Sequence, residues 1–197
     1  MSRLTLTSQL LVKLRNELLN SGDEACAIMF GRPVVKNGRL ARIVVRDVQW
    51  TTNEDYLEKT SMAARLRPEF VSRVAQRARK SGESLIFVHS HSCLLNQFSP
   101  IDDAGEKLLA EFLDRRTPGA VHAAMLITPQ VTIARVLGSG EPLEVIGVGS
   151  QLVWGRDAAI EPNRVSFDRQ VRAFGAAGQN RLREMRVGIV GFPTRSW

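Results

Sequence analysis

The sequence has little cysteine and no long apolar segment. Of its 197 residues only Cys26 and Cys93 are cysteine, too few for a disulfide framework, and in a reducing compartment both stay free thiols. No segment approaches the roughly 18 uninterrupted apolar residues of a membrane-spanning helix. The start, MSRLTLTSQLLVKLRNELL, has too short an apolar run for a signal peptide and is typical of an amphipathic helix. We therefore expect no structural disulfide, no membrane association and a cytoplasmic location.

Stacking aromatics and basic runs are also scarce. The chain has one tyrosine, and its formal net charge of +7 is spread along the sequence; within residues 156–197, eight arginines stand against four acids. A protein that follows the phosphates of a nucleic acid needs a basic run and aromatic side chains for base stacking. Nucleic-acid binding is therefore disfavoured, and the milder interpretation of the charge is attraction to an acidic protein partner.

What the sequence does have is globular composition and a regular order of elements. Hydrophobic residues make up 44% and charged residues 24%, which fits one well-packed domain with some remainder. Helical spacing predicts helices over 7–20, 68–80 and 99–116, and apolar runs predict strands over 24–30, 40–50, 84–88, 121–128, 131–138 and 142–148. The third helix is expected to turn Leu108, Leu109 and Phe112 to the core, and residues 51–67 to be irregular. This order predicts an α/β sandwich with a single mixed sheet and flanking helices in residues 1–155, followed by a tail of different composition, rich in arginine.

Two of the three histidines stand one residue apart in FVHSHSCLLNQFSPIDD, residues 87–103. Alternate side chains of a strand share a face, so His89 and His91 are expected to project together from the C-terminal end of a strand. Ser99 and Pro100 then begin a helix, which puts Asp102 in its first turn, where the helix dipole favours a carboxylate. Two imidazoles and one carboxylate form a three-ligand set for zinc, with the fourth position left for water.

Each half of this pattern also has a purely structural interpretation. Ser-x-x-Asp with proline at the first helical position is an ordinary capping pattern, and a His-x-His pair on a strand is weak evidence for a metal. The two together, across a single strand-to-helix turn, favour a zinc site that lowers the pKa of a bound water toward about 7.

A zinc hydrolase also needs a group that moves a proton from the attacking water to the leaving group. Glu24 is the best candidate, because it stands at the start of the otherwise apolar strand EACAIMFG, where partial burial would raise its pKa. Asp23 is the competing choice. The structural alternative is a strand-end acid that faces solvent.

The combined pattern resembles the JAMM motif of the MPN-type (JAB domain) zinc metallopeptidases, of prokaryotic type. The resemblance rests on Glu24 in E-x-C-A-I-M-F-G and on the spacing His89-x-His91-x(7)-Ser99-x(2)-Asp102, and the element order fits the family over about residues 5–150. It implies the cytidine-deaminase-like JAB/MPN fold, with one Zn(2+) ion per chain held by His89, His91 and Asp102. It also implies that Glu24 is the general acid and base and that Ser99 stabilises the oxyanion of the tetrahedral intermediate.

The chain departs from the family pattern at two places. After the cysteine of its Glu strand the family usually has glycine, whereas this chain has Ala27, whose methyl group we expect to be tolerated; Cys26 is expected in the core. After the second histidine the family often has proline, whereas this chain has Ser92-Cys93. If the strand continued, Cys93 would face the metal as a soft ligand or an oxidisable thiol. The alternative is a free cysteine packed in the loop.

Residues 166–191 resemble a second family, the opening of the ThiF/MoeB-type adenylating domains, which are relatives of ubiquitin-activating enzymes. The stretch SFDRQVRAFGAAGQNRLREMRVGIVG has their Asp-Arg-Gln start, a helix expected over 168–184 and a strand expected over 185–191. The glycine-rich phosphate loop is not completed, because GIVG is followed by FPTRSW, so Arg169, which matches an ATP-contacting arginine, receives no active role. Residues 156–197 are then either an incomplete adenylating domain, through truncation or a disrupted reading frame, or a helix that packs on the peptidase domain.

The two resemblances together imply a zinc-dependent isopeptidase that cleaves after the C-terminal tail of a ubiquitin-like protein, in a conjugation or sulfur-carrier pathway. An activating-enzyme-like domain or partner would belong to the same pathway. The extended tail is expected to add a strand to a sheet edge near residues 51–67. Two alternatives stay open: exopeptidase-like processing of a sulfur-carrier adduct, and a catalytically idle MPN scaffold.

Overall fold

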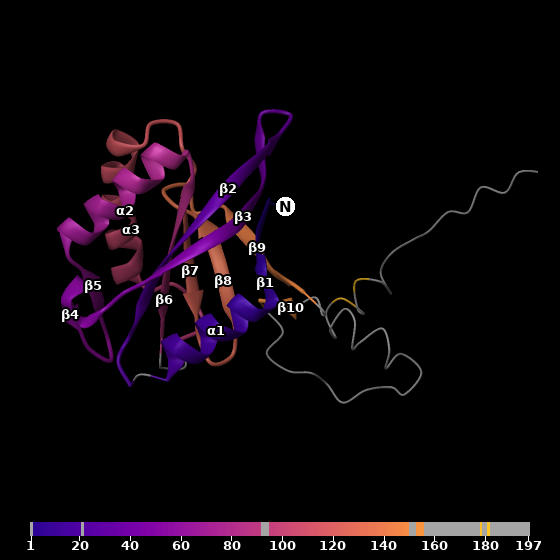
Figure 1. The fold of residues 1–197 in the computed structure, drawn as a ribbon. Helices are drawn as coiled ribbons and strands as arrows, with labels where there is room; N and C mark the ends of the chain where they lie inside the picture. The colour runs from indigo at the N-terminus through magenta and orange to yellow at the C-terminus, as the bar shows by residue number, and fades with distance from the viewer. Residues whose placement is uncertain are drawn as a thin grey trace, which may run out of the picture.

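The computed structural model describes residues 2–20, 22–91, 95–149, 153–155, 178 and 181. Along the chain the elements are β1 (Ser2–Thr7), α1 (Ser8–Leu19), β2 (Cys26–Lys36), β3 (Arg39–Trp50), the 3₁₀ helix η1 (Asn53–Asp55), β4 (Tyr56–Lys59), β5 (Ala64–Leu66), α2 (Pro68–Ser81), β6 (Ser84–Ser90), α3 (Pro100–Arg116), β7 (Ala123–Ile127), β8 (Thr132–Val136), β9 (Pro142–Val148) and β10 (Val153–Trp154) (Figure 1). The expected tail strand lies outside the described residues, as does the expected tail helix except for residues 178 and 181. Among the described helices, none has the length and apolar character needed to cross a membrane.

Seven strands of the main sheet close into a ring. They follow the order β1-β3-β2-β6-β7-β8-β9, and β9 pairs with β1 as well, in parallel from Ser2↔Leu143 to Thr7↔Val148. The pairs β1–β3 and β6–β7 are also parallel, and the other pairs are antiparallel. The predicted mixed α/β fold is confirmed, but the sheet is a closed ring rather than the central layer of a sandwich.

The strand β1, which closes the ring, was not predicted. The helix predicted over 7–20 is confirmed as Ser8–Leu19, with the Thr7 hydroxyl accepting the Leu10 N–H at 3.1 Å, but residues 2–6 before it were not predicted to form a strand. Leu4 and Leu6 are buried while Arg3 is exposed, so this segment has the period of two of a strand. Its partners, β3 and β9, lie far away in the sequence, and a six-residue segment carries too few residues for that period to be decisive.

The two faces of the ring pack against different helices. One core contains Leu11, Leu14 and Leu18 of α1 together with residues from all seven strands of the ring. The other core lies between β2, β6 and β7 and the helices α2 and α3, and is centred on Ile28, Phe30, Phe70, Val74, Ala78, Leu85, Leu113 and Ala124. Figure 1 shows α2 and α3 together on one side of the sheet and α1 apart from them. The alternation of strand side chains therefore decides which residues face α3.

The face that α3 turns to the sheet differs from the prediction. Leu109 and Phe112 pack against the second core as expected, and Leu113 is fully buried. Leu108, however, is 68% exposed, so its assignment to the core was wrong. The inner face of α3 carries four side chains at helical spacing, those of Asp102, Glu106, Leu109 and Leu113. Leu108 is rotated by about 100° around the helix axis from Leu109 and therefore lies off this face.

Residues 51–67 are more regular than predicted. The 3₁₀ helix η1 opens the segment, and β4 and β5 form a two-stranded antiparallel sheet with register Tyr56↔Leu66 and Lys59↔Ala64. The Tyr56 hydroxyl accepts the Cys26 N–H at 2.7 Å and bonds the Thr51 hydroxyl at 2.7 Å. These bonds hold the small sheet against the start of β2.

The third histidine, His122, has a structural position. Its Nδ1 accepts the Leu85 N–H at 2.9 Å, so Nε2 carries the proton and donates to the Thr117 hydroxyl at 2.7 Å, which in turn donates to the Leu113 carbonyl at 2.8 Å. Burial lowers the pKa of His122 to about 4, against the smaller opposing charge of Asp114. The neutral imidazole thus joins β6 to the end of α3.

Because the unfolded chain protonates His122 near its ordinary pKa and the folded chain only near 4, this residue stabilises the fold above about pH 6.5, and that contribution is lost as the pH falls toward 4. The variant His122→Asn keeps an acceptor for the Leu85 amide but does not titrate. We expect it to lower the free energy of unfolding by about 1–3 kcal/mol at pH 7 and to flatten the pH dependence between 4 and 6.5. Denaturant titrations of both proteins across this range measure the difference. An unchanged slope in the variant would contradict the assignment.

Candidate metal centre

The two remaining histidines lie at the end of β6, which pairs with β2 on one side and with β7 on the other. His89 pairs in register with Cys26 of β2, and His91 follows the last strand residue. Phe87 and Leu85 pack on the side of α2 and α3, whereas Ile86 and Val88 pack on the side of α1. His89 therefore projects toward α3, and His91, two residues later, does the same.

Ser90, between the histidines, faces the opposite way and anchors this end of the strand. Its hydroxyl donates to the Leu18 carbonyl at 2.9 Å and accepts the Ala25 N–H at 3.1 Å. All three groups are buried, so these hydrogen bonds are shielded from water. The polypeptide that carries the two imidazoles is thereby tied to α1 and to β2.

The third group, Asp102, is held by the first turn of α3. Ser99 is the N-cap residue and Pro100 the first helical residue. The Ser99 hydroxyl accepts the Asp102 N–H at 3.2 Å, and Asp102 Oδ2 accepts the Ser99 N–H at 2.6 Å, which is a reciprocal capping box. The sequence therefore fixes the direction of the Asp102 carboxylate locally, before any contact with the histidines.

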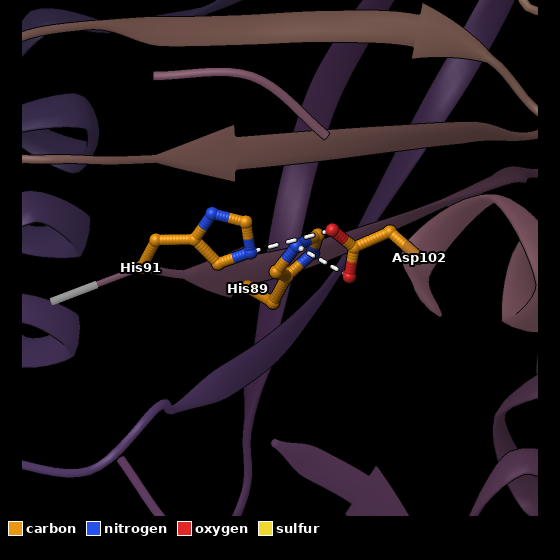
Figure 2. Close-up of side chains that lie close together, drawn as sticks. All are labelled: His89, His91 and Asp102. Carbon is orange, nitrogen blue, oxygen red and sulfur yellow. Dashed lines mark ion pairs between the residues drawn. The ribbon is translucent and has the colours of Figure 1, made fainter. Parts of the chain in front are cut away.

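The three side chains converge in the way that the spacing predicted (Figure 2). His89 Nε2 is 3.2 Å from Asp102 Oδ1, and His91 Nε2 is 3.3 Å from Asp102 Oδ2. One ligand atom from each residue lies within 4.8 Å of the others. In a tetrahedral zinc site with bonds of about 2.0–2.1 Å, neighbouring ligand atoms are about 3.3–3.4 Å apart. The spacing of the three groups thus fits a zinc ion.

The hydrogen bonding of the imidazoles also fits a metal. His89 Nε2 is buried and has no hydrogen bond of acceptable geometry, although Asp102 is close. A buried nitrogen without a partner is unfavourable unless something else binds its lone pair. His91 Nδ1 lies 3.4 Å from the Leu95 carbonyl. If Nδ1 donates its proton to this carbonyl, Nε2 is left with a free lone pair for a metal, and metal-bound histidines usually donate their other ring N–H in this way.

Burial and hydrogen bonds act in opposite directions on Asp102. Burial by itself would raise the pKa of the carboxyl, but the adjacent His89 imidazole and the hydrogen bonds from Ser99 outweigh it, so the pKa lies well below its ordinary value. Asp102 is therefore ionised at neutral pH, as a metal ligand must be.

Glu24 lies beside this cluster. Its residue surface is 8% exposed, its N–H donates to the Thr60 carbonyl at 2.8 Å, and its Oε1 is 3.8 Å from His91 Nε2. Burial raises the pKa of Glu24, the charge of His89 opposes that rise and the charge of Asp102 adds to it. Asp23, the competing choice, is exposed. The structure thus brings together Glu24, His89, His91, Ser99 and Asp102.

The positions that depart from the family pattern have different outcomes. Ala27 is completely buried in the core on the α1 side, so its methyl group is accommodated. Burial and the charge of Glu24 raise the pKa of the Cys26 thiol to about 12, which makes this thiol inert. Ser92 and Cys93 lie outside the described residues.

The groups that orient the predicted site residues could not be recognised in the sequence. The Thr60 carbonyl accepts the Glu24 N–H, and the Leu95 carbonyl lies near His91 Nδ1. The Tyr56 hydroxyl accepts the backbone N–H at the start of β2. Any residue type supplies a carbonyl, so the first two contacts leave no signal in the sequence. Tyr56 is the single tyrosine of the chain, and its isolation was the only hint that it has a specific role.

The closed mixed sheet thus presents a His-His-Asp cluster that could hold a metal ion, beside a buried glutamate. The chain belongs to the family described as prokaryotic homologs of the JAB domain, whose model matches residues 7–137. Among solved structures it is similar to the solution structure of protein DSY2949 from Desulfitobacterium hafniense, with 19% identity, a TM-score of 0.50, and coverage of 74% of this chain and 92% of that one. At this identity the likeness concerns the fold alone. No curated protein matches the chain significantly.

The capping residue and the metal ligand can be separated by mutation. Asp102→Ala should abolish tight zinc binding and also lower the free energy of unfolding, because the carboxylate serves both the cluster and the capping box. Ser99→Ala should remove about 0.5–2 kcal/mol of stability but leave stoichiometric zinc. Metal analysis and denaturant unfolding of both variants measure the two effects. Zinc retained by Asp102→Ala would exclude Asp102 from the ligand set.

Proposed function

We propose that the protein is a zinc-dependent peptidase of the isopeptidase type, acting after the C-terminal tail of a ubiquitin-like protein in the cytoplasm. The observation that supports it most directly is the cluster of His89, His91 and Asp102 with the Glu24 carboxylate 3.8 Å from one imidazole. Zinc bound there would lower the pKa of a bound water molecule and would polarise the scissile carbonyl. The protein's own groups must then transfer protons and stabilise charge.

Glu24 is the proposed proton-transfer group. Its burial raises its pKa, so it can accept a proton from water and then release it to the leaving amine nitrogen. It is not one of the three proposed ligands, and its backbone is fixed by the Thr60 carbonyl. Proton transfer and metal binding are therefore separate tasks of separate residues.

Ser99 is proposed to stabilise the oxyanion. Its hydroxyl oxygen accepts the Asp102 N–H at 3.2 Å, which leaves the hydroxyl proton for donation. The capping box fixes its position before substrate binds, as a preorganised donor requires. Helix capping and oxyanion stabilisation thus use different parts of one hydroxyl group.

An extended peptide substrate suits the surroundings of the cluster. Large apolar side chains are exposed on three segments that adjoin the site residues: Leu57 and Met62 around the β4–β5 turn, Leu95 after His91, and Ile101 beside Asp102. Met62 is 82% exposed and stands two residues from Thr60, the partner of Glu24. Within the described residues β4 and β5 pair only with each other, so a substrate tail could add a strand there.

The identity of the substrate rests on the sequence rather than on the site. The ThiF/MoeB-like stretch at residues 166–191 supports a pathway of ubiquitin-like conjugation or sulfur-carrier chemistry and an activating-enzyme-like partner. The same site geometry also allows exopeptidase-like release of a small adduct from a sulfur carrier. A catalytically idle scaffold is disfavoured, because a scaffold has no need to hold the five site residues together.

Glu24→Gln should reduce turnover by at least about 10²–10⁴-fold while zinc remains bound, because Gln preserves size and hydrogen bonding but cannot transfer the proton. Single-turnover cleavage and metal analysis on the same preparation test both parts. Asp23→Asn is the matched control, since it removes the neighbouring exposed acid, and should leave turnover unchanged. Loss of zinc in Glu24→Gln would mean that Glu24 is a ligand instead.

The substrate proposal is tested by incubating the zinc-loaded protein with ubiquitin-like proteins fused at their C-termini to a second protein or to single small residues. Cleavage of the protein fusions supports an isopeptidase, and selective cleavage of the small adducts supports the exopeptidase alternative. Ser99→Ala should slow whichever reaction occurs by about 10²–10³-fold. If no member of the panel is cut, the ubiquitin-like substrate is wrong.

A further inference from the structure

Arg135 of β8 connects the sheet to the helix that carries Asp102. Its Nε donates to Glu106 Oε2 at 2.9 Å and its Nη2 donates to Asp103 Oδ1 at 2.6 Å. Arg135 pairs in register with Ala124, which packs in the core beneath α2 and α3, so the arginine projects to the face that α3 covers. A planar guanidinium that bonds two carboxylates fixes their direction as well as their charge.

The same guanidinium reaches a metal-site histidine through an aromatic ring. The Arg135 guanidinium carbon lies 3.9 Å from the centroid of the Phe98 ring. The Phe98 ring in turn lies 5.8 Å from the His89 ring, tilted by 58°. Cation–π contacts of this kind are stronger where the cation is shielded from water, and the Arg135 side chain is mostly buried. Movement of Arg135 would therefore remove the support of the His89 ring.

Glu106 places a second, partly buried carboxylate near the cluster. It follows Asp102 by four residues, so both lie on one face of α3. Its Oε1 is buried without a hydrogen-bond partner, and the ion pair with Arg135 is the strongest interaction that keeps it charged, since burial raises its pKa and Arg135 opposes that rise. Without the arginine an uncompensated, partly buried charge would remain next to the helix turn that holds Asp102, which is unfavourable.

We propose that Arg135 is a positioning residue of the metal site. Through Asp103 and Glu106 it fixes the first turns of α3 and hence Asp102, and through Phe98 it fixes the His89 ring. Two of the three ligands thus depend on one side chain that contacts neither. The inference rests on the proposed function only in taking the His-His-Asp cluster as a zinc site.

The test measures zinc affinity in the full chain, by competition with a chromophoric chelator, and the visible spectrum of the Co²⁺-substituted protein. Arg135→Gln should bind zinc about 10–100-fold more weakly, as loss of outer support to metal ligands generally does, and should change the Co²⁺ spectrum. Arg135→Lys keeps the positive charge but lacks the planar guanidinium. Its zinc affinity should lie between those of the wild-type protein and Arg135→Gln.

Arg77→Gln is the matched control. Arg77 also lies over an aromatic ring, 3.7 Å from the centroid of Phe30, and also pairs with a carboxylate, that of Asp47, but it contacts none of the ligands. Its variant should keep the wild-type affinity, so a general effect of losing a stacked arginine is distinguished from a local one. Phe98→Leu removes the ring while the ion pairs of Arg135 remain, and should also weaken zinc binding, which keeps the test decisive if Arg135→Gln does not fold.

The outcomes separate the two proposals. Wild-type zinc affinity in both folded Arg135→Gln and Phe98→Leu, within about twofold, would overturn the positioning role and leave the proposed function intact. A wild-type protein that binds no zinc would overturn the metal site itself, and the positioning role with it.

Discussion

The reciprocal hydrogen bonds between Ser99 and Asp102 are the interaction on which the candidate site depends. A capping box ordinarily satisfies two backbone amides at the start of a helix. Here the carboxylate that accepts one of those amides also faces two imidazoles, at 3.2 and 3.3 Å. The helix dipole and the Ser99 bonds stabilise its negative charge in a partly buried place. The Asp102 carboxylate thus caps the helix and at the same time completes the candidate metal site.

The rest of the fold keeps the partners of Asp102 in place. β6 pairs with β2 on one side and with β7 on the other, and the inward hydroxyl of Ser90 ties its end to α1 and to the residue before β2. The outward positions on either side of Ser90 carry the imidazoles. Glu24 enters the site because β2 is the neighbour of β6, with Cys26 opposite His89. The candidate site therefore lies where β2, β6 and α3 approach one another on one face of the sheet.

Sequence reasoning succeeded where the geometry is local. The His-x-His spacing needs only the alternation of a strand, and Ser99 and Asp102 need only a helix start, so their convergence could be anticipated. Glu24 stands 65 residues before His89 in the sequence, and its proximity depends on strand pairing, which only the resemblance to a family supplied. The same reason explains the omission of β1, and of Arg135, whose contacts with Phe98 and Glu106 cross from one element to another. Leu108 was misplaced because neighbouring leucines on a helix cannot be ranked by hydrophobicity alone.

Closure of the ring by β1 has a consequence for how the chain reaches this structure. The strand β1 pairs with a strand some 140 residues later, at Ser2↔Leu143, so during synthesis β1 is made long before β9, one of its two partners. Contacts of such long sequence separation slow folding, because the entropy of closing the loop is lost before the pairing is gained. Until β9 arrives, β1 presents an unpaired edge, which is the kind of surface that aggregates. Substitutions that weaken the pairing of β1 with β9 would therefore be expected to lower the yield of folded protein.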